Sequence, residues 1–312
     1  MDLRQMKYFL ALAEELNFGR AAARLHMAQP PLTRQIKALE ETLSTALFTR
    51  TAKGVELTAA GQALLDEVPN ILALASRARE RTQRAGQGLI GQMDVGLFGS
   101  GVLDVIPRLL AGFHRVRPEV RIVLHNLTKA EQLQALRERR LTIGFNRLVP
   151  AEAGLAVQTV LQEKLVVALP DTHPLCARSE VALHELDGEP MISYPNTPLP
   201  GLAQEVANAF HREGLRLNVV QSVEDVLTCV ALVAGGFGAC VTTQSAMRLR
   251  LPGVEYRPLH SPHLRDIELS CLYRSDDTSP LLAAFLDVVR DFAMAEQAGQ
   301  ILPRNADAPA LG

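Results

Sequence analysis

Tryptophan is absent from this 312-residue chain, and aromatic side chains make up only 4% of it. Cysteine is also scarce, and the four residues are far apart in the sequence, with no CxxC pair. They are Cys176, Cys229, Cys240 and Cys271. This spacing argues against a disulfide-rich secreted domain and against a cysteine-based zinc site. We therefore expect four reduced thiols, packed in hydrophobic cores.

Long hydrophobic runs are missing as well. The longest uncharged run, residues 226–247, contains three glycines and several hydroxyl and amide side chains. This content predicts a buried helix, a glycine turn and a strand, and not a membrane span. Asp2, Arg4 and Lys7 interrupt the N-terminal segment before any signal-peptide core forms. We expect a cytoplasmic protein that has no membrane partner.

Neither sign of charge dominates, because the formal net charge is −2, and 47% hydrophobic residues are ordinary for a globular chain of two or three domains. The distribution of charge is more informative. Residues 1–90 carry 12 basic and 9 acidic side chains, whereas the rest of the chain carries 20 basic and 25 acidic ones. This asymmetry fits an N-terminal module that binds nucleic acid through a local basic surface, with an affinity that falls as salt rises.

Two short helices are predicted between Asn17 and Leu43, because apolar residues recur at helical spacing on both sides of the sequence MAQPP. Pro30 and Pro31 suit only the first turn of a helix, so the second helix is expected to begin between Gln29 and Pro31. The polar side chains of its N-terminal half are Gln29, Thr33, Arg34 and Lys37. A helix-turn-helix inserts such a helix end into the major groove of DNA. An ordinary helical hairpin with a solvated face is the alternative.

A β-wing is predicted next, over residues 48–58. Gly54 marks a turn, and the residues on both sides of it suit short strands. Arg50 and Lys53 would lie on or near the tip of the wing, where basic side chains hold phosphate groups or enter a minor groove. A basic wing directly after the two helices favours a helix-turn-helix over an ordinary helical hairpin.

One long helix is predicted from Thr58 to Arg84, with apolar residues repeating every three or four positions and Pro69 expected to kink it or to remove a hydrogen bond. Such a seam either packs on its own domain or pairs with a second copy of the helix. The glycines of RAGQGLIGQ then match GxGxxG. A dinucleotide site needs a strand before that motif and a helix after it, but here the order is reversed. We therefore predict a hinge and no cofactor.

The N-terminal region resembles the DNA-binding domain of LysR-type transcriptional regulators along the whole run LRQMKYFLALAEELNFGRAAARLHMAQPPLTRQIKALEETLSTALFTRTAKGVELTAAGQALL. The resemblance implies an all-α winged helix-turn-helix and a linker helix through which two chains dimerise. It also implies a tetramer that bends double-stranded promoter DNA and acts on RNA polymerase. We expect the DNA-facing residues to be Gln29, Pro30, Pro31, Thr33, Arg34, Lys37, Arg50 and Lys53.

From Met93 onward, strand-like and helix-like segments alternate, which predicts a parallel sheet covered by helices and two α/β subdomains. Two of the helices are expected to begin at Val102 and at Ser222. The expected domains are 1–58 (winged helix-turn-helix), 59–88 (linker and hinge) and 89–312 (ligand-binding domain). Subdomain I would comprise residues 89–162 and 266–295, and subdomain II residues 163–265. Residues 296–312 would form a tail, whose Ala- and Pro-rich segment 300–312 is expected to be disordered or to be ordered only within a crystal.

A ligand crevice is expected where strands end and helices begin, between the two subdomains. Ser100 follows the first strand, Thr128 follows the second, and Arg147 follows the third. Hydroxyls, helix N-termini and a guanidinium that converge in this way favour a carboxylate ligand. Each Ser or Thr taken singly is as well explained as a helix cap.

The C-terminal region resembles LysR-type regulators of benzoate, catechol and chlorocatechol degradation, through the runs VGLFGS, LTKAEQLQAL, IGFNRL, THPL and YPNTPLP. This resemblance implies a periplasmic-binding-protein-like fold and an activator of an aromatic catabolic operon. Its inducer would be a small carboxylate such as a muconate or chloromuconate. Ser100 and Thr128 would hold the inducer, and Pro200, Gly201 and Leu202 would close over it. Leu161 stands where a benzoate-responsive relative has a basic residue, so we do not expect a second effector pocket.

An enzyme is not expected. Ser100 lacks the GxSxG frame, because Phe98 and Val102 occupy its outer positions, and no His and Asp pair is evident nearby. His260 and His263 lack a full set of zinc ligands, so no metal is expected. A solute-binding protein with the same fold, or a sensor of a different small anion, is the remaining alternative. Residues 1–84 and the missing signal peptide argue against the solute-binding protein.

Overall fold

The computed structural model describes residues 1–51, 54–195 and 199–298. The chain divides into an N-terminal unit, Met1–Arg84, and a C-terminal unit that begins at Ala85. Lys53 lies outside the described residues, as do positions 299–312 of the predicted tail, whereas residues 296 and 297 form the end of a helix.

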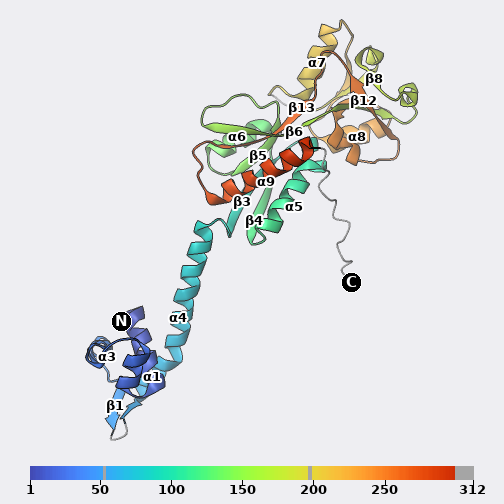
Figure 1. Ribbon diagram of the computed structural model, residues 1–312. Helices are drawn as coiled ribbons and strands as arrows, with labels where there is room; N and C mark the ends of the chain where they lie inside the picture. Colours follow the sequence, from blue (N-terminus) through green and yellow to red (C-terminus); the bar gives the residue numbers. More distant parts are fainter. Residues whose placement is uncertain (52–53, 196–198, 299–312) are drawn as a thin grey trace. The chain divides into compact units, whose positions relative to one another are not determined.

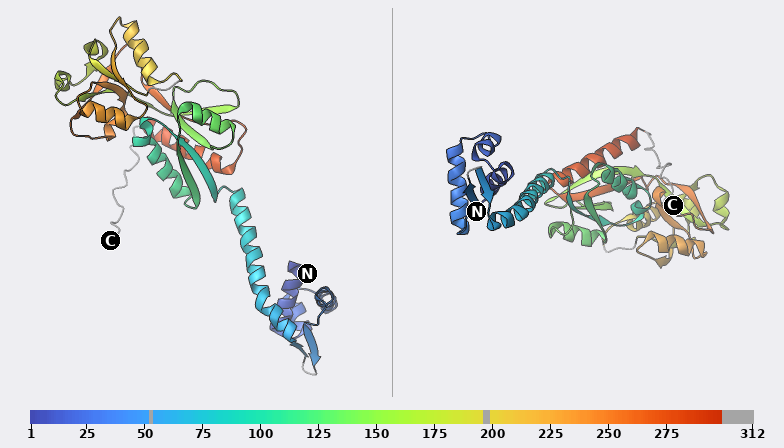
Figure 2. Two further views of the ribbon diagram at one scale, coloured as in Figure 1. Left: turned by 180° about the vertical axis from the view of Figure 1, so that it is seen from behind. Right: turned by 90° about the horizontal axis from the view of Figure 1, so that it is seen from below.

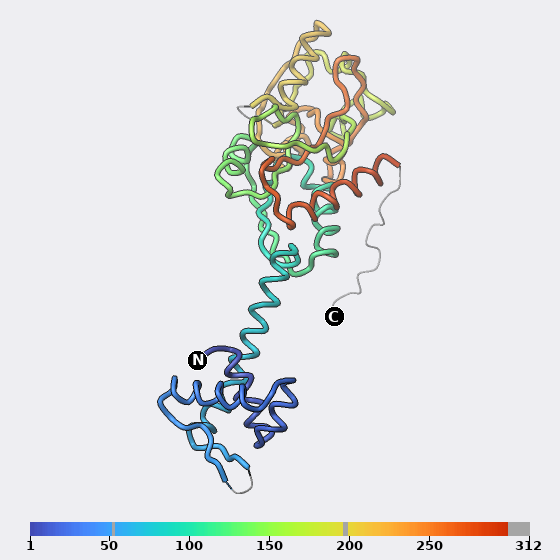
Figure 3. Tube along the Cα trace, turned by 60° about the vertical axis from the view of Figure 1, so that its left-hand side comes forward, coloured from blue at the N-terminus to red at the C-terminus, as the bar shows by residue number. Residues whose placement is uncertain are grey.

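The N-terminal unit contains the predicted helix-turn-helix and wing (Figure 3). Its first elements are α1 (Leu3–Glu15), α2 (Phe18–Arg24), α3 (Gln29–Leu43), β1 (Phe48–Thr51) and β2 (Gly54–Leu57). The three helices bury Phe9, Leu12 and Leu39 completely in one core. Asn17 caps α2 through the backbone N–H of Arg20, and α3 begins at Gln29 as the prolines predict. β1 and β2 pair antiparallel.

The linker helix α4 runs from Ala59 to Gly86 and continues through Pro69. The hydroxyl of Thr58 accepts a hydrogen bond from the backbone N–H of Gly61 at 2.9 Å, as expected of an N-cap. Val68 is fully buried against the helices of this unit, whereas Leu74 is 62% exposed. The apolar stripe is therefore covered in the first half of the helix and open to solvent further along it.

Subdomain I of the C-terminal unit is built on a five-stranded sheet in the order β4-β3-β5-β13-β6. The strands are β3 (Gly91–Leu97), β4 (Val120–Asn126), β5 (Ile143–Arg147), β6 (Leu155–Glu163) and β13 (Ile267–Arg274). The helices are α5 (Val105–Val116), α6 (Lys129–Arg137) and α9 (Pro280–Gln297). α5 and α9 share a core on one face of the sheet, while α6 packs on the other face (Figure 1).

Subdomain II contains a four-stranded sheet in the order β11-β7-β12-β8 and a parallel pair of strands, β9 and β10. The strands are β7 (Leu165–Pro170), β8 (Val181–Ala182), β9 (Pro190–Ser193), β10 (Asn218–Ser222), β11 (Cys240–Thr243) and β12 (Val254–His260). The helices are α7 (Leu202–Arg212) and α8 (Val226–Ala234), which cover opposite faces (Figure 2). Short 3-10 turns are η1 (Ser100–Leu103), η2 (Pro174–Ala177), η3 (Leu183–Leu186) and η4 (Gln244–Arg248).

The predicted parallel arrangement is observed for β3 with β4 and β5, but both main sheets are mixed. β13 runs antiparallel to β5 and β6, and β7 runs antiparallel to β11 and β12. The reason is that the chain leaves subdomain I at the end of β6 and returns to it in β13, so these two strands run in opposite directions. The alternating apolar residues of β6 and β13 predict strands, but they do not indicate the direction in which each strand runs.

Two helix starts also differ from the predictions. The helix expected from Ser222 begins at Val226, because Ser222 pairs with Ser193 in β10 and β9 and Asp225 supplies the N-cap. The helix expected from Val102 begins at Val105, because Ser100–Leu103 forms a 3-10 turn. The structure thus places a tight turn between Gly99 and α5.

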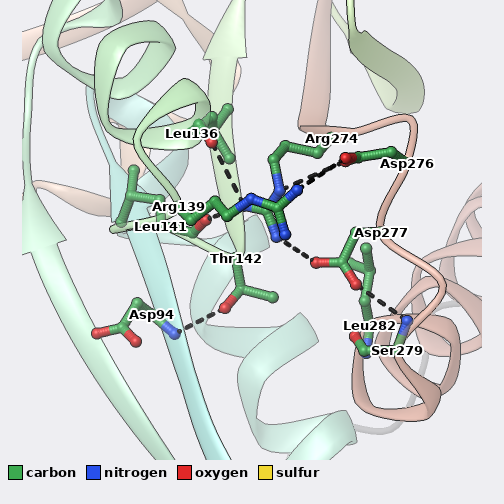
Figure 4. Close-up of polar contacts among 10 residues, drawn as sticks. All are labelled: Asp94, Leu136, Arg139, Leu141, Thr142, Arg274, Asp276, Asp277, Ser279 and Leu282. Atoms are coloured by element: carbon green, nitrogen blue, oxygen red, sulfur yellow. Dashed lines mark hydrogen bonds and ion pairs between the residues drawn. The ribbon is translucent and has the colours of Figure 1, made fainter.

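Arg274 fastens α6 to the segment that leads into α9 (Figure 4). Its guanidinium donates to the carbonyls of Leu136 (3.3 Å) and Leu141 (3.0 Å), where α6 ends and the chain turns towards β5. It also pairs with Asp277 at 2.6 Å. Asp277 in turn accepts from the backbone N–H of Ser279, the N-cap of α9, at 3.0 Å. One buried arginine therefore fixes two helices of subdomain I.

All four cysteines are free, and all but the half-buried Cys176 are buried, as expected. Burial raises the pKa of Cys271 to about 12, so that thiol remains protonated at neutral pH. Within the described ranges, no helix combines the length and apolar content needed to cross a membrane.

Candidate functional site

The predicted DNA-facing residues of α3 share its solvent side. Gln29, Pro30, Arg34 and Lys37 are exposed, while Pro31 and Thr33 are half-buried. The opposite side of the helix packs into the core through Leu32, Ile36 and Leu39. The hydroxyl of Thr33 donates to the carbonyl of Gln29 at 3.1 Å, and Lys37 lies 3.8 Å from the carboxylate of Glu41. The helix therefore presents an amide, two cations and the faces of two prolines.

The first turn of α3 is poor in backbone donors. Its N-cap is Ala28, whose side chain makes no capping bond, and Pro30 and Pro31 have no N–H. Two of the four free N–H groups of a normal helix start are thus missing. This end is suited to contact base edges through side chains, and less suited to bind phosphate through backbone amides. Arg50 is exposed on β1, within the wing.

A pocket of about 450 Å³ lies between the two subdomains of the C-terminal unit. Subdomain I contributes Phe98, Gly99, Ser100, Lys129, Asn146 and Arg147. Subdomain II contributes Tyr194, Pro195, Gly201, Leu202 and Thr243. Four of the six predicted ligand residues line this pocket, namely Ser100, Arg147, Gly201 and Leu202. Strand ends and the start of α7 therefore converge where the crevice was expected.

Hydroxyl groups bridge the two subdomains at the floor of the pocket. The Ser100 Oγ atom lies 2.7 Å from Thr243 Oγ1, and Ser100 is only 2% exposed. Arg147 also donates to Thr243 Oγ1, at 3.4 Å. Burial raises the pKa of the Tyr194 phenol, so that group is neutral and can donate a hydrogen bond. The floor thus offers donors from both subdomains.

Arg147 is only partly satisfied. One nitrogen of its guanidinium, Nη2, pairs with Glu163, whose carboxylate also accepts from the backbone N–H and the hydroxyl of Ser245, at 2.8 and 2.5 Å. The other nitrogen, Nη1, is buried and has no hydrogen-bond partner among the described residues. A buried donor without a partner costs about 1–3 kcal/mol, which marks this atom as available to a ligand.

Lys129 is the buried cation of the pocket and was not among the predicted ligand residues. Only 5% of it is exposed, and its ammonium donates to the carbonyls of Leu148 (3.0 Å) and Pro200 (2.7 Å). No described carboxylate forms an ion pair with it, and burial lowers its pKa. Its position as the first residue of α6 was visible in the sequence, but not the direction of its side chain.

Thr128 and Pro200 lie beside the pocket without lining it. The Thr128 hydroxyl and the Glu131 carboxylate form the capping box of α6, with 2.8 Å between them. Pro200 takes part through its carbonyl, which holds Lys129. Within the described ranges, no group of three or more His, Cys, Asp or Glu side chains is arranged to hold a metal ion.

Sequence relatives identify both units. Residues 3–62 match the bacterial regulatory helix-turn-helix protein model of the lysR family, and residues 86–293 match the LysR substrate binding domain. The transcriptional regulator TfdS of Cupriavidus pinatubonensis (strain JMP 134 / LMG 1197) is 37% identical over 290 residues, covering 93% of this chain and 98% of TfdS. A probable cat1 operon transcriptional activator of Acinetobacter lwoffii is 34% identical over 292 residues, covering 93% and 96%.

Solved structures of LysR family regulators also resemble this chain. Full-length CbnR in complex with its target DNA has a TM-score of 0.84 and 32% identity to this chain, covering 94% of it and all of CbnR. The matched regions include the helix-turn-helix and the two-subdomain domain that holds the pocket. The chain therefore belongs to the LysR family and is a DNA-binding transcriptional regulator, not an enzyme.

Proposed function

We propose that this regulator activates an aromatic catabolic operon when a small dicarboxylate, such as a muconate or chloromuconate, binds between its two subdomains. The observation that carries the proposal is the charge of the pocket, which Lys129 and Arg147 both line; Glu163 pairs with Arg147, and no described carboxylate pairs with Lys129. A buried cation without a counter-ion is costly, and a ligand carboxylate would remove that cost. The sequence resemblance and the operon named for the Acinetobacter relative support the same class of target.

The lining of the pocket suits an acid with an apolar carbon skeleton. Phe98, Leu202 and Pro195 contribute apolar surface to the same pocket as the two cations. The hydroxyls of Ser100 and Thr243 can orient one carboxylate near Arg147. Thr128 stays in the proposed ligand set through its place beside Lys129 at the start of α6, and Pro200, Gly201 and Leu202 remain the proposed closing segment.

We also propose how the regulator is assembled and how it binds DNA. The exposed stripe of α4, with Leu74 at 62% exposure, supports pairing of two linker helices in a dimer, and two dimers would form the tetramer. Gln29, Pro30, Pro31, Thr33, Arg34 and Lys37 would meet bases and nearby phosphates, while Arg50 and Lys53 hold the flanking backbone. Inducer binding would change the DNA bend presented to RNA polymerase in the cytoplasm.

The first test uses a panel of acids. Full-length protein is mixed with muconate, 2-chloromuconate, benzoate and a neutral control, muconate dimethyl ester, and each mixture is heated to measure its unfolding midpoint. We expect the dicarboxylates alone to raise the midpoint, because a ligand that binds only the folded state stabilises it. A shift with the monocarboxylate benzoate, and none with the muconates, would favour the sensor of a different small anion.

Replacing Arg34 with alanine is expected to reduce discrimination between a bound promoter fragment and random DNA. The exposed Arg34 side chain has no hydrogen-bond or ion-pair partner among the described residues, so its guanidinium is free for a bidentate base contact worth ~1–3 kcal/mol. Competition binding at fixed salt measures the ratio of the two affinities. An unchanged ratio would remove Arg34 from the set of base-reading residues.

The pH dependence of inducer binding provides a separate test of Lys129. Burial lowers the pKa of this lysine, and a carboxylate beside it would raise the pKa again by stabilising the charged form. Muconate binding should therefore take up a proton at alkaline pH, between the two pKa values, and weaken as the pH rises through the lower one. Calorimetry in two buffers of different ionisation heat measures this uptake. Equal heats at alkaline pH would contradict the assignment.

A further inference from the structure

Glu40 occupies a position where a carboxylate is normally unfavourable. It lies in the last turn of α3, together with Glu41, and that turn contains no basic residue. The negative end of a helix dipole disfavours acidic side chains there. Glu41 projects into solvent, 3.8 Å from Lys37, but Glu40 is half-buried and has a different set of partners.

The carboxylate of Glu40 binds the base of the wing. Its Oε1 atom accepts hydrogen bonds from the backbone N–H groups of Leu47 at 2.8 Å and of Phe48 at 3.2 Å. Phe48 is the first residue of β1, the strand that carries Arg50 two residues later. Bonds from two amides to one carboxylate are charge-assisted and stronger than neutral ones. Glu40 thus connects the proposed recognition helix directly to the wing.

The same segment is held from its other side by the start of α4. The carbonyl of Leu47 accepts from the backbone N–H of Thr58 at 3.0 Å, and the hydroxyl of Thr58 donates to the carbonyl of Ala46 at 2.7 Å. Gly61 packs so closely on the carbonyl of Leu47 that an added Cβ would lie 2.1 Å from the Leu47 oxygen. The wing base therefore has fixed contacts to α3 and α4 at once.

We infer that Glu40 is a positioning residue for DNA binding, which holds the wing at the spacing from α3 that lets both contact one duplex. Without these two bonds the wing keeps its hairpin pairing and its contacts to α4, but it loses its direct hydrogen bonds to the recognition helix. This inference rests on one part of the proposed function, namely that Arg50 contacts a phosphate of the DNA backbone. The role requires an acceptor atom and not a charge, because a negative charge beside DNA is itself repulsive.

The experiment measures binding of a promoter fragment, selected with the wild-type protein, as a function of salt for Glu40→Ala, Glu40→Gln and Glu41→Ala. We expect Glu40→Ala to weaken binding about tenfold and to reduce the salt slope by about one ion per protomer, because the wing contact is lost. Glu40→Gln keeps an acceptor oxygen and should bind like the wild type. Glu41→Ala, the matched control, should not weaken binding.

A double-mutant cycle with Arg50→Ala shows whether Glu40 acts through the wing. Arg50→Ala is expected to reduce the affinity of the wild type clearly and that of Glu40→Ala only slightly, because the wing of that variant is already misplaced. Unfolding midpoints of all variants show whether the N-terminal unit remains folded. If Glu40→Ala unfolds it, Glu40→Gln decides the question, because a folded Glu40→Gln variant with weaker promoter binding and a reduced salt slope would overturn the role of the acceptor atom.

The outcomes separate this inference from the proposed function. An unchanged salt slope in Glu40→Ala, additive effects in the cycle, or a Glu40→Gln variant as weak as Glu40→Ala would each overturn the positioning role. A normal salt slope in Arg50→Ala would instead remove Arg50 from the phosphate contacts. In that case, a reduced slope in Glu40→Ala would still support placement of the wing by Glu40.

Discussion

Replacing Lys129 with methionine is expected to weaken muconate binding by about 2–3 kcal/mol, which is roughly 30- to 150-fold. Methionine has a similar length but no charge, so the pocket keeps its volume and loses the ammonium that would pair with a carboxylate. Lys129 is 5% exposed and has only backbone carbonyls as partners, so no other described side chain neutralises it. Calorimetric titration of the full-length variant with muconate measures the loss.

The matched control is Lys164→Met, which removes the same charge from an exposed position of the chain crossing between the subdomains. We expect its muconate affinity to stay within about twofold of the wild type, since the charge of an exposed lysine is screened by water and salt. Promoter binding without inducer should be unchanged in both variants. If Lys129→Met lowers the muconate affinity by less than about threefold, the role of Lys129 as counter-ion is contradicted.

Replacing Gly61 with alanine is expected to destabilise the N-terminal unit by about 1–3 kcal/mol, or more, through overpacking. Helix propensity alone predicts the opposite sign, because alanine is better than glycine in a helix by about 1 kcal/mol. The structure decides between the two effects, since the new Cβ would lie 2.1 Å from the carbonyl oxygen of Leu47, a backbone atom fixed by Thr58. Urea unfolding of the full-length protein, together with promoter binding, measures the result.

Gly86→Ala, at the other end of the same helix, is the control. Nothing lies within 4 Å of the Cβ that this substitution would add. We expect its stability to change by less than about 0.5 kcal/mol, or to rise slightly, as for surface substitutions in general. If Gly61→Ala and Gly86→Ala have equal free energies of unfolding, the contact between α4 and the wing base does not restrict residue 61.

Local signals in the sequence predicted much of this architecture. Pro30 and Pro31 predicted the start of α3, because two consecutive prolines are favoured in the first turn of a helix and disfavoured in its interior, and the structure confirms that start. Ser100 and Arg147 were found because a pocket residue at a strand end is recognisable from its own neighbours. Signals of this kind depend on a few consecutive residues and do not require the tertiary fold.

The residues that were missed depend on contacts between distant segments. Thr243 meets Ser100 across 143 positions of the chain, and Tyr194 reaches the pocket from subdomain II. The direction of the Lys129 side chain is set by the carbonyls of Leu148 and Pro200, which no local pattern encodes. Strand direction was missed for the same reason, because a five-residue apolar segment pairs equally well in either direction until the connections are known.

The most direct measurement is a pair of calorimetric titrations of the full-length protein, one with muconate and one with its dimethyl ester at equal concentration. The two molecules share the same carbon skeleton and differ in charge, which is the property that Lys129 and the free nitrogen of Arg147 would recognise. We predict a saturable isotherm with one site per chain for the acid and no binding for the ester. Equal binding of both, or binding of neither, would contradict a carboxylate-sensing pocket between the subdomains.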